Sequence, residues 1–280
     1  MSEISSIATA TTLVDVDLHE LTKSGTLLEE PVLLLTRFFV RGSFELPCLI
    51  TTPQGHYAGV IIANGIVQDP EFSRVTHSYY TVLDANDQPL LDVHRCGNLR
   101  QSETTICAPS SSVPLARVVM QFEHNWHRYD VYDERETQDY VPKPFSSTEV
   151  RAFMENYEFK NSAKEVMVGA RNMRRYYSWM QHQLSSPPKP FLLYFEDPST
   201  VSAVQLPIKS RKNDSVLFHE VRGDKVRATP IQHSLPTGDE RRLFVLIAQF
   251  LIEVEREAVV RLSSDVLLDR QTYSPVVLFK

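Results

Sequence analysis

The sequence predicts an α+β protein, because two hydrophobic periodicities follow one another along the chain. Residues 13–142 hold about eight or nine short alternating segments typical of strands, and no convincing helical repeat. Residues 146–184 then show the apolar spacing of helices, and the C-terminal residues 190–280 show both the helical and the strand pattern. We expect four regions: a flexible arm at 1–12, a β-rich sandwich or barrel-like domain at 13–142, a helical pair at 143–189 and a mixed α/β region at 190–280.

The strands of the β-rich domain are predicted from short apolar segments separated by turn residues. Residues 32–40 form a nearly continuous apolar run, which is typical of a buried strand. The turn sequence Asp84-Ala85-Asn86-Asp87 between two such segments predicts a hairpin. The expected strands are 13–18, 32–40, 44–51, 57–63, 79–83, 90–95, 104–107, 115–122 and 129–132.

Two helices are predicted between residues 146 and 184. Ser146 and Ser162 each stand three residues before a glutamate, which is the spacing of a capping box. In the second helix, apolar residues recur at alternating spacings of four and three, as expected of a helix packed on a partner. This apolar seam consists of Val166, Ala170, Met173, Tyr177, Met180 and Leu184.

The C-terminal region is predicted to combine a four-strand sheet with one long helix. Its first strands are expected at 191–195, 201–206, 216–221 and 226–231, with Gly223-Asp224 as a hairpin turn between the last two. Thr237 and Glu240 form a third capping box, and the helix after it is apolar on more than half of its circumference. We expect this helix to be largely buried and a strand to close the chain at 273–279.

Cysteine usage and the N-terminal residues predict the compartment. Three cysteines, an odd number without CxxC spacing, indicate reduced thiols inside a cell. Residues 1–12 lack the basic and apolar regions of a secretory signal. No stretch approaches the roughly 18 apolar residues of a membrane span. We therefore expect an intracellular, cytoplasmic protein without a membrane segment.

Charge is distributed unevenly between the two halves of the chain. Residues 1–145 hold 10 Lys and Arg against 19 Asp and Glu, and residues 146–280 hold 19 against 16. The most acidic window is 123–139 and the most basic is 160–189. Surfaces of opposite sign favour docking of the halves or head-to-tail self-association, which would weaken in high salt. Ordinary solvated surface is the alternative.

A polar segment at residues 123–130 is the candidate metal site. Imidazole and carboxylate are the ligands of catalytic zinc and iron, so His124, His127 and Asp130 are the predicted ligands, with His77 or His94 to complete the set. On a strand, however, residues 124 and 127 would point to opposite faces. A polar strand end leading into an acidic loop is the alternative interpretation.

A cluster that interleaves cations with aromatic rings is the candidate nucleic-acid surface. It consists of Arg171, Arg174, Arg175, Tyr176 and Trp179. Arginine pairs with phosphates, and Tyr or Trp stacks on bases. The negative net charge of the chain opposes this interpretation, and a basic helix lying across the acidic half is the alternative.

The motifs of common enzyme classes are absent from the sequence. There is no GxSxG, GxxxxGK[ST], GxGxxG or HExxH motif, and no cofactor is predicted. The leading interpretation is a non-catalytic assembly or interaction protein, a structural or accessory component of a larger particle, which binds a protein partner or its own copies. A metal-dependent enzyme and a nucleic-acid-binding protein are the alternatives.

Overall fold

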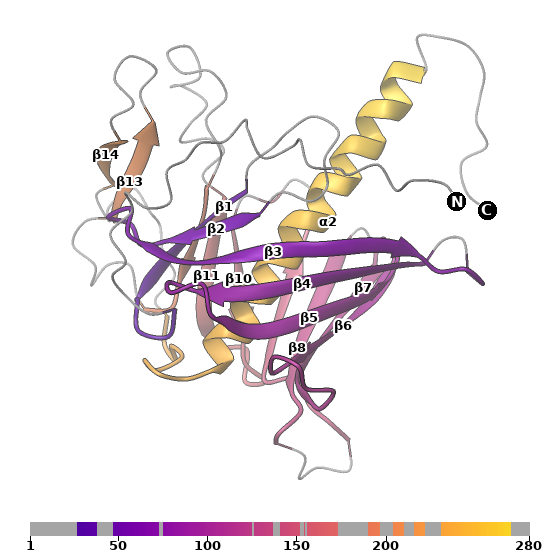
Figure 1. Ribbon diagram of the computed structural model, residues 1–280, viewed down its shortest axis with the longest axis horizontal. Helices are drawn as coiled ribbons and strands as arrows, with labels where there is room; N and C mark the ends of the chain where they lie inside the picture. Colours follow the sequence, from indigo (N-terminus) through magenta and orange to yellow (C-terminus); the bar gives the residue numbers. More distant parts are fainter. Residues whose placement is uncertain are drawn as a thin grey trace, which may run out of the picture.

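Twelve strands of this protein form a closed antiparallel barrel (Figure 1). Because every barrel strand has a hydrogen-bonded neighbour on both sides, no strand edge of the barrel is left open. The computed structural model describes residues 27–37, 47–72, 75–124, 126–136, 141–151, 154, 156–172, 190–196, 204–209, 216–221 and 231–269.

The barrel is a meander from β2 to β12 that is closed by β1. Neighbours in sequence pair as hairpins from β2 onward, and β1 lies between β2 and β12. A separate two-stranded sheet pairs β13 with β14. The strands are β1 (Val32–Arg37), β2 (Cys48–Thr51), β3 (Tyr57–Gln68), β4 (Thr76–Asp84), β5 (Pro89–Gly97), β6 (Gln101–Cys107), β7 (Pro114–Glu123), β8 (Trp126–Asp133), β9 (Ser146–Val150), β10 (Asn156–Lys160), β11 (Val166–Asn172), β12 (Pro190–Tyr194), β13 (Val204–Lys209) and β14 (Val216–Val221).

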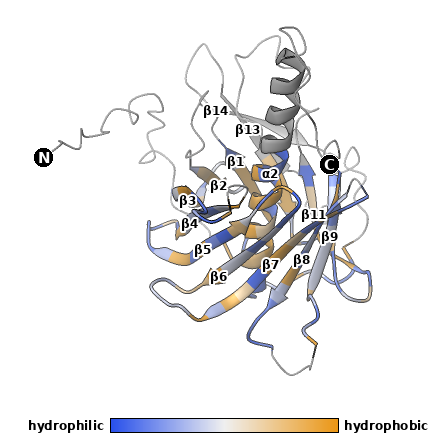
Figure 2. Ribbon diagram, turned by 90° about the vertical axis from the view of Figure 1, so that its right-hand side faces the viewer, coloured by the Kyte–Doolittle hydropathy of each residue, from blue (hydrophilic) through white to orange (hydrophobic). Residues whose placement is uncertain are grey.

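The helix α2 (Arg241–Asp269) begins inside the barrel, and its first half runs through the interior (Figures 1 and 2). Its residues from Arg242 to Ile252 are all buried, whichever side of the helix they occupy. A helix that is apolar around most of its circumference needs burial on all sides, and a surrounding sheet provides it. The predicted long helix is therefore confirmed, and its first half is buried as expected.

The strands supply the rest of this core, because their side chains alternate between the inner and the outer face of the barrel. In β5, Leu91, Val93 and Arg95 are buried, whereas the residues between them are more exposed. Successive side chains of a strand point to opposite faces, so every second residue faces α2. The hairpin predicted around residues 84–87 is confirmed, because β4 and β5 pair on either side of it.

The predicted α+β class, with its sandwich and central helical pair, is wrong. The described residues form a mostly β protein with a single helix. Within the described residues, no helix has the length and apolar character needed to cross a membrane.

The two predicted capping boxes lie in strand and turn structure instead. Ser146 begins β9, and residues 161–165 form the turn between β10 and β11. In that turn, the Asn161 side-chain oxygen accepts hydrogen bonds from the backbone N–H groups of Ala163 and Glu165. Such a side chain competes with helical capping for the same backbone groups.

The predicted apolar seam begins in β11 and not in a helix. Val166, Val168 and Ala170 are buried on one strand, and the rest of the seam lies outside the described residues. Positions 166 and 170 share a face in a helix and in a strand alike, so their spacing could not separate the two. β-branched valines and Gly169 at the centre disfavour a helix, and pairing with β10 and β12 decides the outcome.

Candidate functional site on the β3–β4 hairpin

Four polar side chains meet on the outer face of β4 and β5. The Nδ1 atom of His77 lies 3.0 Å from the Nε2 atom of His94. The other ring nitrogen of His77, Nε2, lies 3.1 Å from Asp69 Oδ2 and 3.9 Å from Cys96 Sγ. Because Ser78 and Tyr80 point into the barrel, His77 must point outward.

The hydrogen bonds of Asp69 identify the donor that faces it. Its Oδ1 accepts from the backbone N–H groups of Glu71 and Phe72 at 2.8 and 2.9 Å. The hydrogen bond from His77 and these two backbone bonds hold the pKa of Asp69 below its usual value. An ionised Asp69 only accepts, so His77 donates to it through Nε2.

The same face carries a stack of three rings. The ring of His94 lies parallel to that of His77, with centroids 5.3 Å apart, and to that of Tyr79, with centroids 4.6 Å apart. Gly65 pairs with Tyr79 from β3, and a Cβ atom there would have no heavy atom within 4 Å. The missing side chain leaves the surface beside Tyr79 open.

The hydrogen-bond geometry of this cluster differs from that of a catalytic triad of nucleophile, base and carboxylate. In such a triad the base uses one ring nitrogen for the nucleophile and the other for the carboxylate. Here Asp69 and Cys96 approach the same nitrogen of His77, and His94 occupies the second. Among the described residues, no group of three or more His, Cys, Asp or Glu side chains is placed to hold a metal ion.

Exposed apolar side chains lie on the same hairpin as this cluster. Val67, Phe72 and Tyr79 are between 41% and 63% exposed, and we call them the hairpin patch. Ile66 is also exposed, but it pairs with the inward-pointing serine of β4 and so lies on the other face. Val67 pairs with His77, so it lies on the outer face beside the ring stack. Figure 1 shows the connection between β3 and β4 projecting beyond the barrel wall.

The pKa of His94 is expected to lie below 6.5, because burial disfavours the imidazolium and charge on His77 opposes it. Native His94 then binds protons less readily than the unfolded chain, so its contribution to stability is lost as the pH falls below about 6.5. NMR titration of the ring protons measures this pKa. His77→Phe should raise it towards 6.5, since it removes the neighbouring charge. A pKa of 6.5 or above in the wild-type protein would contradict the geometry.

The predicted metal ligands His124, His127 and Asp130 are not brought together. His124 lies in the β7–β8 turn at a φ of 48°, whereas His127 and Asp130 point to opposite faces of β8. The His127 ring packs against Phe122, and burial lowers its pKa. Asp130 accepts a hydrogen bond from Arg128 at 3.0 Å and one from a β9 serine.

The predicted nucleic-acid surface lies almost entirely outside the described residues. Only Arg171 is described, and it pairs with Leu192 between β11 and β12. Arg174, Arg175, Tyr176 and Trp179 lie outside the described part of the chain. The nucleic-acid alternative therefore stays a prediction.

A buried ionic cluster joins α2 to the barrel wall. Glu255 accepts hydrogen bonds from Arg95 at 2.8 Å, Ser102 at 3.1 Å and Tyr129 at 2.5 Å. Burial and the Glu255 carboxylate hold the pKa of Tyr129 well above its ordinary value, so its hydroxyl stays a donor. These groups satisfy one another, which is how charges are kept in an interior.

A second polar group lies close by on the same helix. Glu253 accepts from Tyr157 at 3.1 Å and from Arg256 at 3.1 Å. Arg256 also donates to the carbonyl oxygen of Met154 in the β9–β10 connection. Side chains of α2 and the wall thus hold each other in register, which indicates a structural role for both buried groups.

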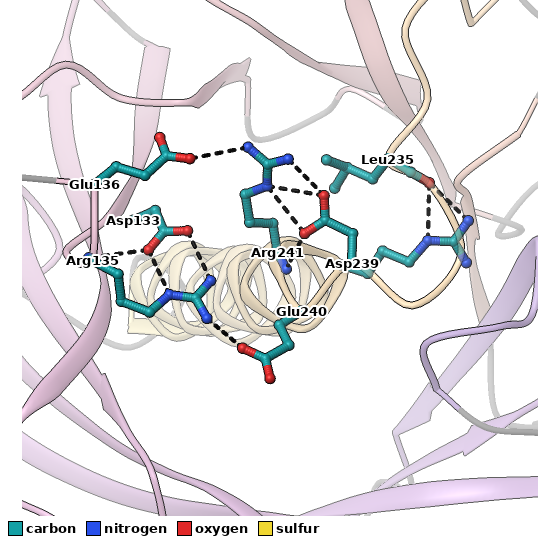
Figure 3. A network of polar contacts seen from close by, with 8 residues as sticks. Asp133, Arg135, Glu136, Leu235, Asp239, Glu240 and Arg241 are labelled. Carbon is teal, nitrogen blue, oxygen red and sulfur yellow. Dashed lines mark hydrogen bonds and ion pairs between the residues drawn. The ribbon is translucent and has the colours of Figure 1, made fainter.

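Ion pairs link the first turn of α2 to the end of β8 (Figure 3). The helix begins two residues after Asp239, whose carboxylate accepts from the backbone N–H of Arg241 at 2.9 Å. The cap is therefore Asp239 and not the predicted Thr237. The network comprises Asp133, Arg135, Glu136, Asp239, Glu240 and Arg241.

The buried side chain of Arg242 also holds the first turn of α2 in place. Its guanidinium donates to the carbonyl oxygen of Leu235 at 2.8 and 3.0 Å, and to those of Leu28 and Glu30 at 3.0 and 3.1 Å. It also lies over the ring of Phe195, 4.7 Å from the centroid. Arg242 thus ties the start of α2 to the segments before β1 and before the helix itself.

No family model, curated protein or solved structure matches this chain. The site therefore rests on its own geometry. His77 and His94 are recognisable in the sequence as possible members of a site. Asp69 and Tyr79 were missed, because only the pairing of β3, β4 and β5 places them beside the histidines.

Proposed function

We propose that this protein is a non-catalytic interaction protein that binds copies of itself through the hairpin patch. The observation that carries this proposal is the exposure of Val67, Phe72 and Tyr79 on one projecting hairpin. Exposed apolar side chains beside polar groups are typical of protein–protein contacts. Tyr79 adds an aromatic ring, a residue type enriched in such contacts.

The occupied interior of the barrel also supports a role for the outer surface. The first half of α2 fills the space that a ligand-binding barrel would leave for its ligand. The polar groups around Glu253 and Glu255 bind one another. The outer hairpin is therefore the better candidate for binding.

An apolar contact is favoured over the charge-driven contact expected from the sequence. Four acids of the acidic window, Asp130, Asp133, Glu134 and Glu136, each pair with an arginine of the same chain. These acids are already neutralised locally, so they offer less attraction to the basic half of a neighbour. Self-association through the hairpin patch should then persist in high salt.

Replacing Val67 and Phe72 together by aspartate is expected to abolish self-association, because each carboxylate would have to be desolvated in the contact. Light scattering and sedimentation should show an oligomer for the wild-type protein at about 100 μM, and a monomer for the variant, a loss of at least about tenfold in association constant. The wild-type oligomer should remain at about 1 M NaCl, whereas an ionic contact would dissociate.

Val113→Asp is the matched control, because Val113 is also an exposed valine but precedes β7, outside the hairpin patch. It should leave the association unchanged, and all variants should keep the wild-type melting temperature. A wild-type protein that is monomeric at every salt concentration, or an oligomer that Val67→Asp/Phe72→Asp leaves intact, would overturn the proposal.

A further inference from the structure

A mainly apolar cavity of about 420 Å³ lies at the end of the barrel where α2 begins. Its walls come from the first turn of the helix, from β3, β5 and β7, and from the segment before β1. Leu243 and Phe244 form the helical wall, and Leu90 and Leu115 form the sheet wall. Cavities of this size and character hold small ligands in other proteins.

Part of this lining is only half-buried, although the residues are leucines. Leu28, Leu90 and Leu115 pack against the core yet keep an accessible face. Neighbouring apolar residues of the same strands that do not line the cavity, such as Val93 and Ala116, are buried. Apolar area that remains accessible inside a concave site gains free energy when a ligand covers it.

The polar lining of the cavity is acidic. Asp84 and Glu240 contribute carboxylates, Asn86 contributes an amide, and the described lining includes no Lys or Arg. Asp84 Oδ1 accepts two backbone hydrogen bonds in the β4–β5 turn, at 2.7 and 2.8 Å. Glu240 is more than half exposed, and its partner Arg135 is shared with Asp133. Figure 3 shows Arg135 between the two acids, so this group keeps a net negative charge.

We propose that this cavity is a binding site for a small amphiphile with an aliphatic chain and a cationic head, of the alkylammonium class. The chain lies against Leu90, Leu115, Leu243 and Phe244, and the head lies at the mouth beside Asp84 and Glu240. An aliphatic chain fits the apolar walls, and a cation fits a mouth at which the described lining holds two carboxylates and no basic side chain. This site is separate from the hairpin patch and does not depend on it.

Calorimetric titration of the full chain with n-alkylammonium ions, from hexyl to dodecyl and below their micelle-forming concentrations, tests the proposal. Affinity should rise by up to about fourfold for each added methylene and level off once the cavity is filled. Alkyl sulfates of the same lengths should bind at least about tenfold more weakly. Absence of alkylammonium binding at every chain length, or equal binding of the sulfates, overturns the proposal.

Three variants locate the site. Ala108→Phe and Ala85→Phe each place a ring in the cavity from a half-buried position, and each should weaken binding at least about tenfold. Ala163→Phe, at an exposed position in the β10–β11 turn, should not change it. If one cavity variant has a folding defect, which its melting temperature would reveal, the other variant still tests the site. Unchanged affinity in a folded cavity variant overturns the assignment.

The double variant Asp84→Asn/Glu240→Gln distinguishes the contribution of the cationic head group to binding from that of the aliphatic chain. The amide introduced at position 84 would keep the oxygen that accepts the turn hydrogen bonds, so the fold should be retained. Binding of the alkylammonium ions should fall about tenfold, whereas binding of neutral alkyl alcohols should not change. Equal loss for the ammonium ions and the alcohols would overturn the role of the carboxylates.

Discussion

Glu255→Ala is expected to lower the free energy of unfolding by about 3–5 kcal/mol, because it leaves the Arg95 guanidinium buried without its anion. Arg95 and Glu255 are 6% and 2% exposed, and their side-chain atoms lie 2.7 Å apart at the closest. Ser102 and Tyr129 would lose the same acceptor. Urea unfolding at neutral pH measures the change.

The double variant Arg95→Met/Glu255→Met is the control for this prediction. Replacing both charges with apolar side chains of similar length removes the unpaired cation, so it should cost less than Glu255→Ala alone. The remaining loss should come from the hydroxyl groups of Ser102 and Tyr129. A loss below about 1 kcal/mol for Glu255→Ala would mean that this helix side chain does not face the barrel wall.

Arg242→Ala is expected to cost about 3–5 kcal/mol, because three backbone carbonyl groups lose their donor inside the protein. The guanidinium is fully buried, and the alanine would also leave an unfilled volume beside Phe195. Because Arg242 joins the start of α2 to residues 28–30, hydrogen exchange in both segments should become faster together.

The neighbouring residue provides a matched control. Arg241→Ala removes the same side chain one position earlier, where it is partly exposed and pairs with Asp239 and Glu136. Exposed pairs contribute little, so this variant should cost less than about 1 kcal/mol. Equal losses at positions 241 and 242 would contradict the different burial of the two guanidinium groups.

The hairpin site was only partly accessible to sequence reasoning. His77 and His94 were recognisable because they lie beside or within the two segments that were expected to pair, 79–83 and 90–95. The position of Asp69 depends on the bulge between Ala63 and Gly65, which shifts the register of β3 by one residue. A shift of one residue moves every later side chain to the other face, and no local pattern reports it.

The helix and many strands were determined by the sequence itself. The segment from Leu243 to Leu251 is apolar around most of its circumference, so any stable fold must bury it. The turn at residues 84–87 has residues that favour a hairpin whatever surrounds them. These features depend on residues close together in the chain, and the structure confirms them.

Closure of the barrel was decided only by the tertiary structure. β1 must find β12 across a long stretch of intervening chain, and β9 to β11 become strands because they fill the remaining wall. Their apolar spacing suits a helix as well as a strand, so the free energy of pairing with neighbours and covering α2 selects between them. A pattern that two structures satisfy equally is resolved by contacts between distant residues, which the local sequence does not encode.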